Sequence, residues 1–271
     1  MDNILNNLDK DIRKLLVAQL RNLWTHTSTA IEGNTLTLGE TAFVIEEGLT
    51  VSGKPLKDHQ EVVGHARAID LIYDLIKKDA VSEKNISDLH KAVQTEAIFD
   101  VYKPVGKWKV EPNWTSMIDG DKQVMFEYAA PGDVPILMTE WLNLLNSYIK
   151  KELLQEDALD AYARLHISFV RIHPFYDGNG RIARLVSNIP VLKSGFPPII
   201  IPKQRRREYI MALTEYHLSA GPPIPGEPLL PETEKIKNFK IFCAESWKES
   251  IELVNTAQRK HAERYGKKHT E

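Results

Sequence analysis

One twelve-residue segment, His173 to Arg184, constrains this chain more than any other part of the sequence. It reads His-Pro-Phe-Tyr-Asp-Gly-Asn-Gly-Arg-Ile-Ala-Arg. Apolar residues at helical spacing predict a helix over 158–170 before it, and Pro174 cannot continue that helix. A second apolar stripe predicts another helix after it, with one face made of Ile182, Leu185, Val186 and Ile189. The segment is therefore expected to be a tight loop that ends at the N-terminus of a helix.

The predicted position of this loop suits it to hold an anion. The first turn of a helix carries unpaired backbone N–H groups and the positive end of the helix dipole. Gly178 and Gly180 allow the backbone to come close to a bound group. Arg181 and Arg184 can reach along one helix edge toward the same anion, and guanidinium groups match phosphate oxygens. The segment therefore predicts a phosphate site, although it lacks the Gly-x-x-x-x-Gly-Lys-Ser/Thr pattern of a P-loop.

Two further residues of the loop indicate chemistry as well as binding. Asp177 is its only carboxylate, and one or two carboxylates together with substrate phosphates are enough to hold Mg²⁺. His173 can take up a proton near neutral pH. A plain turn is the alternative, because Asp, Asn and Gly are favoured turn residues. The presence of a base, a carboxylate, two glycines and two arginines within one loop favours a functional site.

The segment resembles the signature of the Fic family (filamentation induced by cyclic AMP). Fic proteins are all-helical enzymes, and most transfer AMP from ATP to a hydroxyl group of a protein. The resemblance implies that His173 is the base, that Phe175 anchors the loop and that Asp177 binds Mg²⁺. It also implies contacts to the α- and β-phosphates from Gly178, Asn179, Gly180 and Arg181. Arg184 is implied to contact the γ-phosphate.

The resemblance gives a role to a second segment, Thr25 to Asn34. Thr29 and Glu32 fit the capping box that begins a helix. Alternatively the segment lies inside a helix, where Ser28 and Glu32 share a face and Gly33 ends the helix. Many Fic proteins carry an inhibitory Ser-x-x-x-Glu-Gly motif, whose glutamate pairs with the second arginine of the signature and blocks the γ-phosphate. The resemblance favours the second interpretation, with an inhibitory motif made of Ser28, Glu32 and Gly33.

Residues 106–128 interrupt the helical pattern. Strands are predicted over 106–110 and 124–128 with a turn over 118–121, so this stretch is expected to form a β-hairpin. One interpretation of this hairpin is a surface insertion without a function of its own. Fic proteins have a comparable flap that clamps the target chain by strand-like pairing, and its tip is placed here at Asn113, Trp114, Thr115 and Ser116. Pro112 removes a backbone donor where the flap begins, which leaves the pairing geometry open.

The rest of the chain predicts an all-α fold around this hairpin. The predicted layout is an N-terminal helix (1–24), a Fic domain (25–220) with its inhibitory helix near 25–34 and its flap near 106–128, and a proline-rich linker with a C-terminal helix (221–271). The resemblance further implies that two residues of the helix predicted over 206–219 lie near the nucleotide base, namely Tyr209 and His217.

Composition argues against several classes of protein. With 37 acidic and 35 basic residues the formal net charge is −2, which does not suit a dedicated nucleic-acid binder. The single cysteine, Cys243, permits no internal disulfide framework. The N-terminus does not read as a signal peptide, and no apolar run is long enough to cross a bilayer. A cytoplasmic protein with no membrane or nucleic-acid partner is therefore expected.

These observations predict a protein adenylyltransferase that moves AMP from ATP to a Ser, Thr or Tyr hydroxyl of a protein, uses Mg²⁺ and is inhibited by Glu32. The target protein is not named by the sequence. Self-modification and a homodimer are left open, as are UMP and phosphocholine as transferred groups. One alternative is hydrolytic removal of AMP, with Glu32 orienting the water. Another is a regulatory module that holds a nucleotide without turnover, against which the full set of base, carboxylate and arginines argues.

Overall fold

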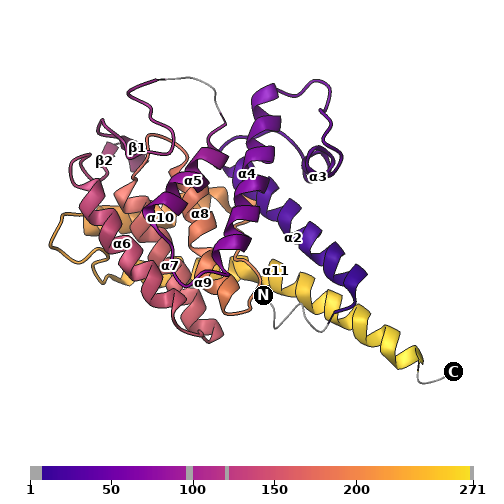
Figure 1. Ribbon diagram of the computed structural model, residues 1–271. Helices are drawn as coiled ribbons and strands as arrows, with labels where there is room; N and C mark the ends of the chain where they lie inside the picture. Colours follow the sequence, from indigo (N-terminus) through magenta and orange to yellow (C-terminus); the bar gives the residue numbers. More distant parts are fainter. Residues whose placement is uncertain (1–7, 96–99, 120–121, 269–271) are drawn as a thin grey trace.

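The computed structural model describes residues 8–95, 100–119 and 122–268, and Figure 1 shows them as a cluster of helices with one hairpin. Strands β1 (Trp114–Asp119) and β2 (Lys122–Glu127) pair antiparallel. The all-α class with a small hairpin is confirmed. The helices are α2 (Lys10–Ile31), α3 (Leu38–Glu47), α4 (Leu56–Leu75), α5 (Glu83–Val93), α6 (Val134–Ile149), α7 (Gln155–Ile172), α8 (Asn179–Val186), α9 (Asn188–Lys193), the 3₁₀ helix η1 (Lys203–Arg205), α10 (Arg206–Ala220) and α11 (Glu234–Lys268).

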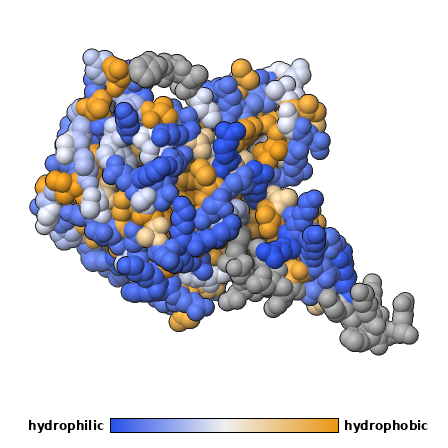
Figure 2. Space-filling view, in the orientation of Figure 1, coloured by the Kyte–Doolittle hydropathy of each residue, from blue (hydrophilic) through white to orange (hydrophobic). Residues whose placement is uncertain are grey.

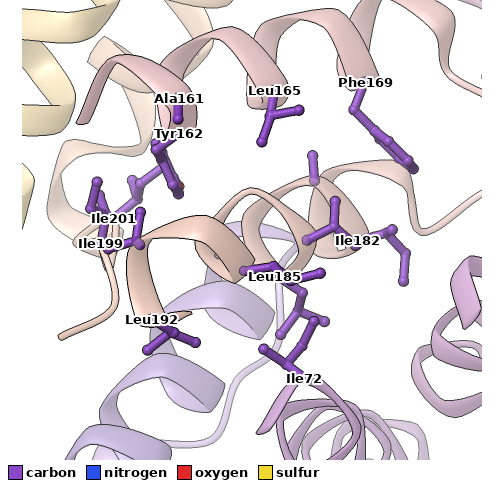
Figure 3. Close-up of a cluster of buried hydrophobic side chains, with 14 of the residues drawn as sticks. Ile72, Ala161, Tyr162, Leu165, Phe169, Ile182, Leu185, Leu192, Ile199 and Ile201 are labelled. Carbon is purple, nitrogen blue, oxygen red and sulfur yellow. The ribbon is translucent and has the colours of Figure 1, made fainter. Parts of the chain in front are cut away.

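Helix α7 supplies much of the core. Its apolar side chains face α8 and α9, as Figure 3 shows for Leu165 and Phe169 above Ile182 and Leu185, and all four are fully buried. The Trp141 indole of α6 donates to the Leu165 carbonyl at 3.0 Å from the other side. Burying one such side chain stabilises the fold by about 1.5–3 kcal/mol. This packing fixes the ends of α7 and α8, and therefore the loop between them.

The second apolar stripe forms two short helices, because α8 ends at Val186 and α9 begins at Asn188. Pro190 has no N–H for the carbonyl of Val186, and its ring excludes that carbonyl from the helix. The break therefore lies one turn before the proline. The Asn188 side chain holds this break by donating to the carbonyls of Arg184 and Ile199 at 2.9 and 3.0 Å.

Helix α2 runs without a break from Lys10 to Ile31, so the predicted division into helices at residue 24 is wrong. Thr29 lies inside α2, where its hydroxyl donates to a backbone carbonyl of the preceding turn at 2.9 Å. The capping-box interpretation of Thr29 is therefore wrong. Glu32 closes the helix, and Gly33 has a φ of +105°, a conformation that glycine adopts without strain. The alternative, in which this motif ends a helix, is confirmed.

The first predicted strand, residues 106–110, is not a strand. Gly106 donates its N–H to His90 Nδ1 at 2.8 Å, and Lys109 donates its N–H to the Pro174 carbonyl at 2.8 Å. The backbone of this segment therefore pairs with α5 and with the loop after α7 rather than with a second strand. Alternating residues alone could not reveal these partners, which are distant in sequence.

The hairpin is built from residues further along the chain. Trp114 pairs with Glu127 at its open end, and Asp119 pairs with Lys122 next to the connection. The predicted flap tip at 113–116 is therefore wrong, because these residues lie at the base of the hairpin. Part of the predicted turn, residues 120–121, lies outside the described residues.

The linker and α11 pack against α7 and α10. Residues 221–231 form no regular helix or strand, and the buried Arg171 holds them by donating to the carbonyls of Gly221 and Leu229 at 2.7 and 2.6 Å. Helix α11 then packs on α7, α10 and α2, and its far end extends past the other helices beside α2 (Figure 1). Within the described ranges, no helix combines the length and the apolar character that crossing a membrane requires.

The surface is mixed in character. Hydrophilic residues predominate on the face that Figure 2 shows, and hydrophobic residues lie between them. Several apolar side chains of α3, of α4 and of the segment between them are exposed, namely Leu38, Phe43, Leu49, Leu56 and Val63. Such residues are compatible with a subunit interface, and the homodimer stays a prediction.

Candidate active site

His173 ends α7 in a strained backbone conformation. Its φ of 51° is the one positive value at a non-glycine position among the described residues. This conformation costs about 1–2 kcal/mol for an L-residue, and such strain is common at functional sites. The His173 N–H still donates to the Phe169 carbonyl at 2.9 Å. The left-handed turn ends the helix and leaves the imidazole at the wall of a pocket.

The surroundings of His173 indicate which ring nitrogen can act as a base. Nδ1 lies 3.2 Å from the Val170 carbonyl, which can only accept, so Nδ1 carries the proton and Nε2 keeps its lone pair. Burial, together with the positive charge of Lys109, lowers the pKa of His173 to about 3, so the ring is neutral at neutral pH. The Tyr128 ring stacks on it, with 3.7 Å between centroids. A general base needs such a neutral, fixed imidazole.

The loop after His173 is locked by Phe175 and Asn179. The Asn179 side chain accepts from the Phe175 N–H at 2.9 Å and donates to the Phe175 carbonyl at 2.8 Å. Asn113 donates to the same carbonyl at 3.0 Å. The Phe175 ring is fully buried, as the resemblance implied for a loop anchor. Because the Asn179 amide is committed to the loop, its predicted phosphate contact would come through its backbone N–H.

The two glycines of the loop serve different purposes. Gly178 begins α8 with a φ of +79°, which directs the chain into the helix and leaves the first N–H groups of α8 without helical partners. At Gly180, a Cβ atom would lie 2.8 Å from Glu32 Oε1 and 3.2 Å from Arg184 Nη1. A side chain at this position would therefore collide with whatever group binds Arg184, whether a carboxylate or a phosphate.

Arg184 connects the loop to the N-terminal helix. Its side chain is only 2% exposed, and its Nη2 donates to Glu32 Oε1 at 2.5 Å and to the Ser28 carbonyl at 2.9 Å. Its Nε donates to Ser28 Oγ at 3.0 Å, and its Nη1 donates to the Tyr209 hydroxyl at 3.3 Å. Burial alone would lower the pKa of Arg184, but the Glu32 carboxylate raises it, so the guanidinium stays charged. The predicted pairing of Glu32 with Arg184 is therefore present in the structure.

Asp177 and Arg181 form a second ion pair at the pocket. Arg181 Nη2 donates to Asp177 Oδ2 at 3.0 Å and to Gln94 Oε1 at 3.4 Å. The Asp177 side chain is 58% exposed, so its second oxygen is open to a ligand. The described residues contain no group of three or more side chains that could hold a metal ion by themselves. A lone carboxylate fits Mg²⁺ only where substrate phosphates and water complete the coordination.

One pocket of about 300 Å³ brings most of the predicted residues together. Its walls come from the loop and α8, from the end of α2, from the hairpin and from α10. The predicted residues that line it are Glu32, Thr115, His173, Asp177, Gly178, Asn179, Gly180, Arg181, Arg184, Tyr209 and His217. Ser28 and Gly33 do not line it. Ser28 contacts Arg184, and Gly33 follows Glu32 at the end of α2. Among the predicted flap residues, Thr115 lines the pocket, whereas Asn113, Trp114 and Ser116 do not.

Part of the candidate site lies in a segment that matches a known protein family. Residues 80–190 match the Fic/DOC family, a range that includes α5, the hairpin, α6, α7 and the entire loop from His173 to Arg184. This part of the chain is a Fic/DOC domain. Glu32, Tyr209 and His217 lie outside the matched range, so the site is completed by helices on either side of the Fic domain.

Relatives of known sequence match beyond the Fic domain. The protein adenylyltransferase fic-1 of Caenorhabditis briggsae is 34% identical over 194 residues, which cover 70% of this chain and 36% of that protein. The protein adenylyltransferase Fic of Drosophila virilis is 35% identical over 183 residues, 67% of this chain and 35% of that protein. The chain therefore spans about a third of the length of these relatives.

Solved structures share the same architecture. A Fic domain containing signaling protein from Bacteroides thetaiotaomicron has a TM-score of 0.82 at 28% identity and covers 94% of this chain and 92% of its own. A structure of Fic-1 from Caenorhabditis elegans has a TM-score of 0.69 at 28% identity and covers 92% of this chain and 66% of its own. The shared fold thus includes the helices that surround the Fic domain.

The sequence did not reveal His90, which lies under the loop of the Fic domain. Gly106 donates its N–H to His90 Nδ1, so Nε2 carries the proton and donates to the Asp177 carbonyl at 3.0 Å. The imidazole also stacks on Phe175, with ring centroids 3.8 Å apart. Burial lowers the pKa of His90 to about 4 and keeps it neutral. One histidine on the buried face of a helix gives no sign of these contacts in the sequence.

The sequence also did not reveal Lys109, a lysine that is only 3% exposed beside the Fic loop. Its Nζ donates to Asn113 Oδ1 at 2.5 Å and lies 5.9 Å from the centre of the Tyr128 ring. Burial lowers the pKa of Lys109 to about 8, so the group is mainly charged at neutral pH. Because this charge disfavours a second charge on His173, Lys109 helps to keep the imidazole neutral.

Replacing Lys109 with methionine is expected to move the acid limb of the activity profile to higher pH. Loss of the positive charge makes the imidazolium form of His173 easier to reach, which raises the pKa of His173, and a protonated base is inactive below that pKa. The measurement is the rate of the transfer reaction proposed below, between about pH 3 and 8, a range that includes the pKa of His173. Lys109→Arg, which keeps the charge, is the control. An unchanged acid limb in Lys109→Met would show that Lys109 does not tune His173.

Proposed function

We propose that this chain is a protein adenylyltransferase that transfers AMP from ATP to a hydroxyl group of a protein. The observation that carries the proposal is the accepting Nε2 of His173 in one pocket with the N-terminus of α8, Arg181 and Arg184. A base and an anion cradle in one pocket suit attack of a hydroxyl on a phosphate. The adenylyltransferase names of the relatives agree with this chemistry.

The proposed reaction is an in-line displacement at the α-phosphorus of ATP. His173 Nε2 takes the proton of the target hydroxyl, the hydroxyl oxygen forms a bond to the α-phosphorus, and the bond from that phosphorus to the bridging oxygen of the β-phosphate breaks. The products are the AMP-modified protein and pyrophosphate. The first N–H groups of α8 and the Arg181 guanidinium stabilise the negative charge on the phosphates.

Asp177 is proposed to hold Mg²⁺ together with the phosphates, and the ion would neutralise charge on the leaving pyrophosphate. We expect Asp177→Ala to raise the Mg²⁺ concentration for half-maximal transfer by about tenfold or more, since even loss of an outer partner of a metal site has effects of that size. The measurement is a Mg²⁺ titration of the transfer rate at fixed ATP. An unchanged titration would mean that other groups hold the metal.

Inhibition by Glu32 is proposed to work through Arg184. The Glu32 carboxylate occupies the guanidinium edge that the γ-phosphate of ATP would use, at 2.5 Å from Nη2. ATP can then enter the pocket, but its triphosphate is not oriented for in-line attack. Ser28 accepts from the Nε of the same guanidinium and keeps Arg184 turned toward α2.

A second candidate function is hydrolytic removal of AMP from a modified protein. Glu32 lines the same pocket as His173, so its carboxylate could orient a water toward the phosphorus. In that reaction His173 would return a proton to the leaving hydroxyl oxygen. Cytoplasmic location, self-modification and a homodimer stay predictions from the sequence.

Position-specific labels test the proposed transfer. The chain is incubated with Mg²⁺ and a cell lysate as acceptor, using ATP labelled either at the α-phosphate or at the γ-phosphate. Adenylyl transfer predicts label in protein only from the α-position. Label from the γ-position would indicate phosphoryl transfer instead, and no label from either would favour the non-catalytic nucleotide-binding module. Parallel incubation with α-labelled UTP and GTP reveals which nucleotide is used.

A further inference from the structure

Arg184 donates hydrogen bonds to two different elements, namely α2 with its C-cap residue Glu32, and α10. Three of them go to α2, at Ser28 Oγ, the Ser28 carbonyl and Glu32, and involve Nε and Nη2. The fourth joins Nη1 to the Tyr209 hydroxyl of α10 at 3.3 Å. Tyr209 therefore holds the guanidinium edge that α2 does not reach, and its hold does not depend on Glu32.

The Tyr209 hydroxyl passes the hydrogen bond on to His166 of α7. A guanidinium N–H can only donate, so the Tyr209 oxygen accepts from Arg184 and directs its own proton to His166 Nε2 at 2.9 Å. Among the described residues, His166 Nε2 is the acceptor recorded for the Tyr209 proton, and in this arrangement the imidazole carries its own proton on Nδ1, which has no recorded partner there. We therefore assign the order of donors as Arg184 to Tyr209 to His166.

Burial keeps this chain of groups in one protonation state. His166 is fully buried, and burial together with the charge of Arg184 lowers its pKa well below the usual range, so the ring stays neutral and its Nε2 accepts. Burial raises the pKa of Tyr209 to about 12, so the hydroxyl keeps its proton. At neutral pH the chain is a charged guanidinium, a neutral phenol and a neutral imidazole.

We infer that Tyr209 and His166 form a positioning relay, which holds the Arg184 guanidinium in place for the γ-phosphate of ATP when Glu32 gives way. This inference rests on the proposed function. When a γ-phosphate replaces the Glu32 carboxylate, Ser28 and Tyr209 are the partners left to fix the plane of the guanidinium. The Tyr209 hydroxyl acts through Arg184, which differs from the contact with the nucleotide base that the family resemblance implied.

The test compares ATP with ADP, because ADP has no γ-phosphate to meet Arg184. In a Glu32→Gly background, Tyr209→Phe is expected to weaken ATP binding by about tenfold, the size typical of a lost hydrogen bond to a charged group, and to leave ADP binding unchanged. Calorimetry gives both dissociation constants. Equal weakening of ATP and ADP would indicate contact with the base and would overturn the relay, as would no weakening of either.

Tyr162→Phe is a matched control, since it removes another buried hydroxyl whose ring centroid lies 5.4 Å from that of His166. The Tyr162 hydroxyl has no hydrogen-bond partner among the described residues, so neither nucleotide should bind differently. His166→Phe should reproduce the selective loss of ATP affinity, whereas His166→Gln, which restores an acceptor, should recover part of it. If His166→Phe does not fold, the Tyr209→Phe comparison still decides the question.

The same data separate the relay from the proposed function. The Glu32→Gly parent should bind ATP more tightly than ADP, because Arg184 is free to meet the γ-phosphate. If the two nucleotides bind this parent equally, the assignment of Arg184 to the γ-phosphate is wrong and the relay falls with it. If the parent prefers ATP and Tyr209→Phe leaves that preference intact, the relay alone is wrong.

Discussion

His173→Ala is expected to lower the rate of AMP transfer by about 10²- to 10⁴-fold while leaving ATP affinity largely unchanged, because a positioned base contributes a factor of that size. The phosphates are proposed to be held by other groups, namely the start of α8, Arg181 and Arg184. Transfer is measured in single turnover with α-labelled ATP, and affinity by calorimetry. Alanine keeps the Cβ atom that strains the positive φ at position 173, and Asn179 still holds the loop through Phe175, so the loop geometry should persist.

A contrary result would be informative. Weaker ATP binding in His173→Ala with a normal rate at saturating ATP would show that His173 is a binding residue. Tyr128→Phe is a suitable comparison, because it keeps the ring that stacks on His173 and removes only the hydroxyl. That variant should retain most of the transfer rate.

Glu32→Gly is expected to raise the rate of AMP transfer by about tenfold or more, within the roughly 5- to 150-fold range of coupling between two such sites. The glycine frees the Arg184 Nη2 that donates to Glu32, so Arg184 can orient the triphosphate. Any hydrolytic removal of AMP should fall in the same variant, because the carboxylate that would orient the water is gone. Initial rates across a range of ATP concentrations measure the gain.

Glu32→Gly is expected to lower stability moderately. Glu32 is 38% exposed, but Arg184 is 2% exposed, so the variant leaves a buried guanidinium without its carboxylate. Removing one partner of a fully buried pair costs about 3–5 kcal/mol, and the exposure of Glu32 brings the expected loss below that range. Arg184 keeps its bonds to Ser28 and Tyr209. A chain of this length loses about 2–4 °C of melting temperature per kcal/mol. A marked loss of stability without any gain in transfer would show that Glu32 is structural.

The sequence predicted the helical core well because its signals are local. The stripes on α7 and α8, and the proline that divides the second stripe, depend on spacing within about ten residues. The capping box that begins α3 is equally local: Thr37 and Glu40 fit the Ser/Thr-x-x-Glu pattern, and both of its hydrogen bonds are present at 3.2 and 2.7 Å. The capping-box pattern is misleading at Thr29, because Thr29 and Glu32 fit it although Thr29 lies inside α2.

The hairpin was predicted less well because strands depend on distant partners. Residues 106–110 alternate like a strand, yet Lys109 pairs its N–H with Pro174, 65 positions away. Asn113 likewise serves the loop, through the Phe175 carbonyl, rather than a flap tip. A single sequence offers no signal for such pairings.

The candidate site also has a part that the sequence predicts and a part that depends on contacts between distant residues. The chemistry-bearing residues from His173 to Arg184 are contiguous, so the sequence displays them together. The groups that tune them, namely His90, Lys109 and Tyr128, come from other elements and meet the loop only after folding. Ser28 and Glu32 were found because a short motif pointed to them, and the structure places both on Arg184.

His173 and Glu32 are proposed to act at one site with opposite effects on AMP transfer. The most direct measurement is the incorporation of α-labelled AMP into lysate proteins by the parent chain, by Glu32→Gly and by Glu32→Gly/His173→Ala, at equal concentrations in Mg²⁺ and ATP. We expect weak labelling by the parent, at least about tenfold more by Glu32→Gly, and none above background by the double variant. Equal labelling by the parent and Glu32→Gly, or strong labelling by the double variant, would contradict the proposal.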